Sequence, residues 1–203
     1  MKKLSLLLIL IFAMQFAAFG QSADDEYTKR GIEKVKAKDY KGSIKDFNKA
    51  IMVNPNNAIA YYYRGHAKIE ISNQKSANKD FDKAIELNPK FQKAYIGRGM
   101  AKLGFNDNEG AFKDFSKAIE LKPDDAEAYC KLGYVKSNLK DFKGACEDWT
   151  KAIELKPDYS EAYFIRGITK TQFSDMEGAC QDWKKAKELG MKEAEGFISQ
   201  YCK

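Results

Sequence analysis

Residues 95–123 read YIGRGMAKLGFNDNEGAFKDFSKAIELKP. The glycine at position 99 and the proline at position 123 recur along the chain at a constant interval of 34 residues. The recurring residues are Gly31, Gly65, Gly99, Gly133 and Gly167, together with Pro55, Pro89, Pro123 and Pro157. A constant period in this range indicates a stack of similar small units rather than one globular core. Function is therefore to be sought on the surfaces of such a stack.

Other residues keep the same register. A tyrosine precedes each recurring glycine by four residues, and a small residue, an aromatic residue and an alanine follow it by 12, 16 and 19 residues. In the third unit these residues are Tyr95, Ala111, Phe115 and Ala118. Each unit thus carries two apolar stripes at helical spacing, separated by a short polar turn. Small residues such as Gly99 and Ala111 allow two antiparallel helices to approach closely, and the proline ends the second helix.

This pattern resembles the tetratricopeptide repeat (TPR), from residue 24 to about residue 193, without insertion or deletion. The resemblance implies an all-α fold, a right-handed α-solenoid in which each helix-turn-helix repeat contacts only its neighbours. The five predicted 34-residue repeats cover residues 24–57, 58–91, 92–125, 126–159 and 160–193.

Two positions depart from the repeat pattern. Ser43 stands in place of the first alanine, and Gly190-Met191 replaces the last proline, where a glycine C-cap is expected. In residues 194–203, apolar side chains recur at helical spacing, namely Ala194, Phe197, Ile198 and Tyr201. We expect this segment to form one amphipathic helix that caps the last repeat.

The first twenty residues are predicted to lie outside the solenoid. Lys2 and Lys3 precede an almost wholly apolar run over residues 4–19, and Ala18 and Gly20 supply the small residues of a cleavage site. This pattern is typical of a secretory signal peptide over residues 1–20, cleaved before Gln21. Cleavage would leave a TPR domain over residues 21–203.

The alternative interpretation of the apolar run is an uncleaved membrane anchor. The run is shorter than the roughly 20 residues that a membrane-spanning helix needs. The first cysteine is Cys130, so no cysteine follows the run to carry a lipid, and no second apolar run exists. We therefore expect an exported protein, periplasmic or secreted, with no stable membrane insertion after cleavage.

The charge balance argues against nucleic-acid binding. The formal net charge of +6 falls to +4 without Lys2 and Lys3, since 33 basic side chains then face 29 acidic ones. Basic and acidic residues are interspersed along the chain, whereas nucleic-acid binding requires a concentrated basic face.

The four cysteines allow three disulfide pairings in an exported chain. Cys146 and Cys180 occupy the same place in successive repeats, on the second helix and facing the first helix of the next unit. Cys202, 22 residues after Cys180, has Ile168 as its counterpart one repeat earlier. We predict a Cys180–Cys202 disulfide that ties the cap to the array, the alternative being two buried thiols. For Cys130 and Cys146 a bridge and free thiols both remain open.

A second resemblance concerns the setting of the protein. The run Gly-Ala-Cys-x-Asp-Trp at residues 144–149 and 178–183, followed by a Tyr-Cys ending, resembles exported repeat proteins of Bacteroidota. It implies a periplasmic or secreted setting and specifies no partner.

Three charged positions recur with the repeat. An arginine precedes the glycine in four units, an aspartate precedes the second-helix aromatic residue in all five, and a lysine follows the glycine by three residues in all five. These charges form either a track for a polyanion or a ladder of Arg–Asp pairs between packed helices, and we favour the ladder because the guanidinium group suits bidentate pairing with a carboxylate. Leu132 interrupts the arginine series, so one aspartate near the fourth unit is expected to lack its arginine.

The sequence contains no catalytic constellation. His66 is the only histidine, so neither a histidine-rich metal site nor a Cys–His pair is supported. The glycines belong to helix packing and turns rather than to a phosphate-binding loop. We predict no enzymatic activity, no cofactor and no metal.

The resemblance to the TPR family implies that the first helices line a concave face on which peptides bind. Carried onto this chain, the positions one residue after the tyrosine and one residue after the glycine should line a peptide-binding groove. The predicted groove residues are Tyr62, His66, Ile96, Met100, Cys130, Tyr134, Phe164 and Ile168. The lining is apolar and aromatic, and it lacks the Lys and Asn set with which some members of the family clamp a C-terminal carboxylate. Some of these side chains could instead simply pack against adjacent helices.

These observations predict an exported, non-enzymatic scaffold that binds a peptide or protein segment in an apolar groove. The alternative is a structural role, in which the array stacks on itself or on an envelope complex through its ends or its convex face. Exposed apolar surface usually marks interaction sites, which favours the first interpretation.

Overall fold

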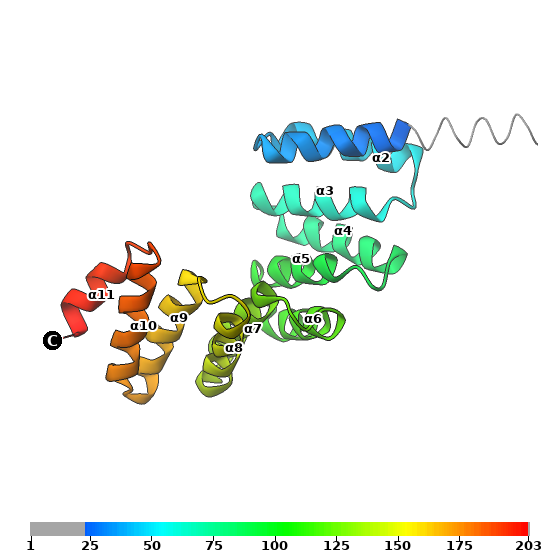
Figure 1. Ribbon diagram of the computed structural model, residues 1–203. Helices are drawn as coiled ribbons and strands as arrows, with labels where there is room; N and C mark the ends of the chain where they lie inside the picture. Colours follow the sequence, from blue (N-terminus) through cyan, green and yellow to red (C-terminus); the bar gives the residue numbers. More distant parts are fainter. Residues whose placement is uncertain (1–22, 203) are drawn as a thin grey trace, which may run out of the picture. The chain divides into compact units, whose positions relative to one another are not determined.

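The computed structural model describes residues 23–202, which form two compact units, residues 23–101 and 102–202 (Figure 1). All regular secondary structure in these residues is helical, and helices that follow one another in sequence pack in pairs. The predicted all-α repeat solenoid is therefore confirmed. The predicted signal peptide, residues 1–20, lies outside the described residues.

In the first unit a helix over residues 23–36 precedes four labelled helices. These are α2 (Tyr40–Val53), α3 (Ala58–Glu70), α4 (Gln74–Leu87) and α5 (Gln92–Leu103), the last of which ends just beyond the unit. Helix α3 packs against both α2 and α4.

The second unit contains the remaining helices. They are α6 (Asn108–Leu121), α7 (Ala126–Asn138), α8 (Phe142–Leu155), α9 (Ser160–Lys170), the 3-10 turn η1 (Thr171–Phe173), α10 (Met176–Glu188) and α11 (Ala194–Tyr201). Each α-helix of this unit packs against the next one in sequence. Among the helices of residues 23–202, none has the length and apolar character needed to cross a membrane.

One aromatic ring forms the centre of each repeat. Phe47, Phe81, Phe115, Trp149 and Trp183 are fully buried. The recurring glycine of the first helix lies directly against this ring, because a Cβ atom placed at Gly31 or Gly133 would come within 2.5 Å of Phe47 or 2.8 Å of Trp149. The glycine is thus required chiefly by the aromatic ring, rather than by the small residue opposite it on the second helix.

The turns between the two helices of a repeat share one backbone conformation. In all five, one non-glycine residue has a positive φ of 60–65°, namely Lys38, Ser72, Asn106, Lys140 and Ser174. The next residue is the N-cap of the second helix, and in four repeats its aspartate accepts a hydrogen bond from a glycine amide three residues later. The exception is Asn73, which accepts no such bond.

Candidate interaction surfaces

The recurring charges form an ion-pair ladder inside the repeats, as predicted. Arg64 and Arg166 each hold an aspartate in a bidentate pair, with Nε and the terminal nitrogen 2.9 and 2.6 Å from the carboxylate oxygens of Asp80 and Asp182. Arg30 contacts Asp46 through one terminal nitrogen. Each of these aspartates is buried, so this charge series is packed structure and not a free track for a polyanion.

The recurring lysine belongs to the same ladder. In all five repeats its ammonium group lies 2.7–2.9 Å from the carboxylate of the second helix. These lysines are Lys34, Lys68, Lys102, Lys136 and Lys170. At Asp46, Asp80 and Asp182, an arginine and a lysine therefore share one buried carboxylate.

The arginines also connect successive repeats. The second terminal nitrogen of Arg64 donates to Asn48 of the preceding second helix at 2.7 Å, and that of Arg166 donates to Thr150 at 2.9 Å. Arg98 contacts Asp82 at 2.8 Å in the corresponding way. One guanidinium group thus ties a repeat to the repeat before it.

Asp148 is the aspartate that Leu132 leaves without an arginine, as the sequence predicts. Its carboxylate keeps Lys136 at 2.7 Å, but burial raises its pKa. At Asp46, by contrast, the hydrogen bond from Arg30 lowers the pKa to about 2. The pKa values of these two aspartates are therefore shifted in opposite directions, by burial at Asp148 and by the Arg30 hydrogen bond at Asp46.

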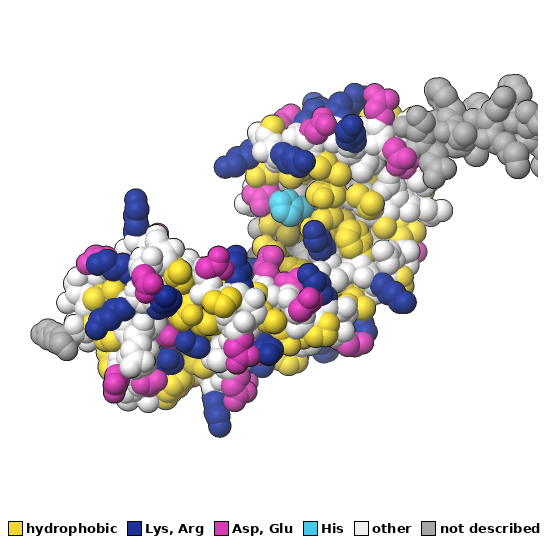
Figure 2. Space-filling view, in the orientation of Figure 1, with side chains coloured by type: hydrophobic (Ala, Val, Ile, Leu, Met, Phe, Trp, Pro, Cys, Tyr) yellow, Lys and Arg dark blue, Asp and Glu magenta, His cyan; other side chains and the backbone are white. Residues whose placement is uncertain are grey.

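The first-unit surface consists of the four predicted groove residues in α3 and α5, namely Tyr62, His66, Ile96 and Met100. Met100 is 38% exposed, Tyr62 and His66 are half-buried, and Ile96 is only 8% exposed. The ring of Tyr62 lies 5.0 Å from that of Phe91, so it is fixed by aromatic packing. Figure 2 shows hydrophobic side chains gathered on one face of this unit beside its histidine. Ile96 offers little area to a ligand, whereas the other three remain accessible.

The second-unit surface consists of the four predicted groove residues in α7 and α9, namely Cys130, Tyr134, Phe164 and Ile168. Tyr134 is 47% exposed, but Cys130 is 2% exposed and packs against Trp149, whose Nε1 donates to the Cys130 carbonyl at 3.1 Å. The expectation that Cys130 lines a groove is therefore wrong, because its side chain belongs to the core. Phe164 and Ile168 are half-buried and pack towards Trp183 and α11.

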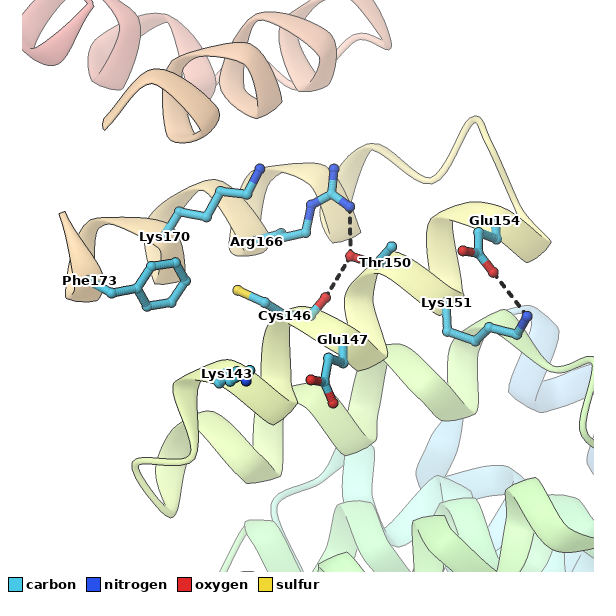
Figure 3. A pocket seen from close by; sticks show the side chains of 9 residues that line it. All are labelled: Lys143, Cys146, Glu147, Thr150, Lys151, Glu154, Arg166, Lys170 and Phe173. Atoms are coloured by element: carbon cyan, nitrogen blue, oxygen red, sulfur yellow. Dashed lines mark hydrogen bonds and ion pairs between the residues drawn. The ribbon is translucent and has the colours of Figure 1, made fainter. Parts of the chain in front are cut away.

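A pocket that sequence analysis did not identify lies between α8 and α9. Its volume is about 470 Å³, and Cys146, Thr150, Arg166, Lys170 and Phe173 are among its lining residues (Figure 3). Arg166 and Lys170 are both engaged by Asp182, so neither is a free anion-binding group. The only sequence signal for this pocket is the register, which places Cys146 opposite the next first helix.

The four cysteines divide into one bridge and two thiols. Cys180 and Cys202 form a disulfide with their Cα atoms 5.6 Å apart, the pairing that the repeat register predicts. Cys130 and Cys146 are free, which decides between the two states that the sequence leaves open. Burial raises the pKa of each of these thiols to about 11, so both are weak nucleophiles at neutral pH. Within residues 23–202, no three His, Cys, Asp or Glu side chains gather as a metal site.

Comparison with known families identifies the repeats. A family profile described as tetratricopeptide repeat matches residues 58–91 and 126–159, and a TPR repeat profile matches residues 33–70 and 106–140. The chain is therefore a protein of tetratricopeptide repeats.

Solved structures with the same fold are also TPR proteins. The crystal structure of MamA is 27% identical, covers 81% of this chain and 96% of its own, and superposes with a TM-score of 0.72. YrrB, described as a TPR protein with an unusual peptide-binding site, is 19% identical, covers 86% of this chain and 90% of its own, and gives a TM-score of 0.69. The first TPR of Spaghetti (RPAP3), bound to the HSP90 peptide SRMEEVD, is 26% identical, covers 59% of this chain and 94% of its own, and gives a TM-score of 0.58. No curated protein matches the sequence significantly.

Proposed function

We propose that this chain is a non-enzymatic scaffold that binds a peptide or protein segment on the first helices of its repeats. The observation that carries the proposal is the exposure of Tyr134 and Met100, at 47% and 38%, on rigid helices at the register that the family uses for ligands. Large amphipathic and flexible apolar side chains of this kind are common anchors of protein interfaces. The mechanism is preorganisation, because the packed repeats hold these side chains in place before a partner arrives.

The chemistry of the two surfaces defines the class of segment that would bind. The similar RPAP3 repeat binds an HSP90 peptide rich in carboxylates. The first-unit and second-unit surfaces of this chain offer no lysine or asparagine at the predicted lining positions, and the recurring arginines are held by buried aspartates. We therefore favour an apolar or aromatic segment over an acidic C-terminal tail.

The proposal includes export to the periplasm or the medium. Its basis is the signal-like pattern over residues 1–20 and the Cys180–Cys202 disulfide, since structural disulfides persist mainly in oxidising compartments. Intact mass measurement of the protein recovered from its native host tests this part. A mature chain that begins at Gln21 is expected, and a cytosolic chain that begins at Met1 would refute it.

Binding is tested by crosslinking and affinity capture from the cell envelope with three matched proteins. The first is the wild type, the second carries Tyr62→Ala, Met100→Ala and Tyr134→Ala, and the control carries Met52→Ala, Ile59→Ala and Phe112→Ala. The control removes exposed apolar side chains outside the two surfaces. Partners that are lost only in the second protein, with its helical content unchanged, would support the proposal. Partners retained by the second protein would refute it.

The second candidate function is self-assembly or docking on an envelope complex, and one observation favours it. Met52, Val53 and Ile59 are 77%, 39% and 51% exposed at the connection between α2 and α3. At the register position of Met52, repeats two to five carry a glutamate, and at that of Ile59, repeats three to five carry a lysine or a glutamate. Concentration-dependent association that disappears in a Met52→Glu/Ile59→Lys variant, measured by sedimentation, would favour this candidate.

A further inference from the structure

Helix α11 occupies the place of a sixth first helix. Its residues follow those of α9 by one repeat length, so that Phe197 corresponds to Tyr163 and Ile198 to Phe164. Tyr201 stands where the other first helices carry their glycine. Helix α11 packs against α10 (Figure 1), so it covers the face on which a further repeat would stack.

The covered face is apolar and aromatic. It consists of Ala179, Trp183 and Ala186 in α10, with Phe164 and Ile168 of α9 at its edge. The ring of Phe197 lies 5.1 Å from both Phe164 and Trp183, and Ala194 is fully buried. Two residues of the predicted groove are therefore partly hidden by the chain's own last helix.

Apart from its apolar contacts with α9 and α10, α11 has few noncovalent interactions that hold it in place. The helix has eight residues and no side-chain cap at its start, and isolated helices of this length are not stable in water. Tyr201 is 44% exposed, and the Lys187–Glu195 ion pair is exposed at both ends, where such pairs contribute little. The Cys180–Cys202 disulfide joins the end of α11 to α10, so without this bond only the apolar contacts hold the helix in place.

We infer that α11 is a redox-controlled cap, and that the face beneath it binds an amphipathic helix of a partner protein. A dithiol reductant donates two electrons and two protons to the Cys180–Cys202 bond, which becomes two thiols while the dithiol becomes a disulfide. The freed α11 then leaves Trp183 and Phe164 open. The partner helix is expected to resemble α11, because α11 fits this face. Its contact residues would then be small, aromatic, aliphatic and aromatic at positions i, i+3, i+4 and i+7.

Hydrogen exchange of the full mature chain tests the cap. Three proteins are compared: the oxidised wild type, Cys180→Ser/Cys202→Ser, and the control Cys130→Ser/Cys146→Ser, which keeps the disulfide. The amides of residues 194–202 are expected to exchange at least about tenfold faster in the first double variant, and at the wild-type rate in the control. Equal protection in all three proteins would overturn the inference.

Binding to the uncovered face is tested with a labelled peptide of residues 190–203 that carries Cys202→Ser. The tethered α11 competes at a high effective concentration, so a third protein, Cys180→Ser/Cys202→Ser/Phe197→Asp, weakens the chain's own cap. Saturable binding is expected to be strongest to this triple variant, weaker to the double variant and absent from the oxidised wild type. The same peptide with Phe197→Asp is expected not to bind. Equal binding to the oxidised wild type, or no binding to the triple variant, would overturn the inference.

This inference rests on the proposed scaffold function, but separate experiments can refute the inference and the proposed function. A Tyr134→Ala substitution lies outside the covered face, so it is expected to leave binding of the peptide unchanged. If the Tyr134→Ala variant loses envelope partners but still binds the peptide, the result tests the proposed surfaces and leaves the cap unaffected. If envelope partners are captured as proposed but the peptide binds none of the proteins, only the inference about the cap is refuted.

Discussion

Gly133 lies beneath the indole ring of Trp149, and this contact shows how strongly one residue of a repeat restricts another. A Cβ atom at Gly133 would meet Trp149 at 2.8 Å and the carbonyl oxygen of Ala145 at 3.1 Å. We expect Gly133→Ala to lower the free energy of unfolding by about 1–3 kcal/mol, since overpacking must move a buried ring or backbone.

The matched control for this substitution is Gly196→Ala. A Cβ atom at Gly196 meets nothing within 4 Å, so the exchange is expected to stabilise the chain by up to about 1 kcal/mol through helix propensity. Urea denaturation of both variants measures the difference. A Gly133→Ala protein as stable as the wild type would show that the ring moves aside without cost.

Asp46 and Asp148 are expected to respond to acid in opposite directions. The hydrogen bond from Arg30 lowers the pKa of Asp46 from 3.8 to about 2, so its contribution to stability is present above pH 3.8 and is lost as the pH falls towards 2. Burial raises the pKa of Asp148, so folding disfavours its ionised form, and this cost disappears as the pH falls.

Denaturation at about pH 7 and about pH 2.5 tests this difference. The destabilisation caused by Asp46→Asn is expected to be larger at the higher pH, whereas that caused by Asp148→Asn is expected to be smaller there. Parallel pH dependence of the two variants would contradict the assignment of the two environments.

At the scale of single helices, the N-caps of the second helices differ between repeats. Asp141 accepts a hydrogen bond from the Gly144 amide at 3.0 Å, whereas Asn73 accepts none. We expect Asp141→Ala to cost about 1 kcal/mol and Asn73→Ala to cost close to nothing. Thermal unfolding followed by circular dichroism measures both, and equal losses would show that the cap bond contributes little to stability.

The turn before each of these caps explains a part of the fold that sequence patterns did not reveal. Lys38, Ser72 and Lys140 adopt a left-handed conformation that favours glycine, asparagine or aspartate. Only Asn106 has a residue type that marks such a turn. The polar segment between the helices could therefore be predicted, but its common backbone geometry could not.

For the whole molecule, the reactivity of the cysteines reports on the packing of the array. Cys130 is 2% exposed, Cys146 is half-buried, and both have a pKa of about 11. With a disulfide-based thiol reagent near neutral pH, we expect slow reaction of Cys146 and reaction of Cys130 only after unfolding. A Cys146→Ser variant is the control, and it should show no reaction in the folded state. Rapid modification of both thiols would contradict the burial described here.

The sequence predicted the repeat architecture well because each repeat depends on a few positions at constant spacing. Gly133 and Trp149 are visible in the sequence for the same reason that they pack, and the pairing of Cys180 with Cys202 follows from the register. The candidate surfaces were predicted less well. The resemblance to the family placed Cys130 on a ligand face, but the exposure of this side chain depends on how the neighbouring Trp149 packs, which spacing does not specify.

The arginine ties between repeats have a mechanical consequence. Arg166 joins α9 to α8 by a directional bond to Thr150, whereas α7 presents the aliphatic Leu132 at the same register. Dispersion contacts shear gradually under load, while hydrogen bonds of a guanidinium group break at a defined extension. If the second unit were stretched along the chain, we therefore expect the junction of α6 and α7, which has the exposed Asn138–Asn108 hydrogen bond but no guanidinium bond, to yield before the junction of α8 and α9.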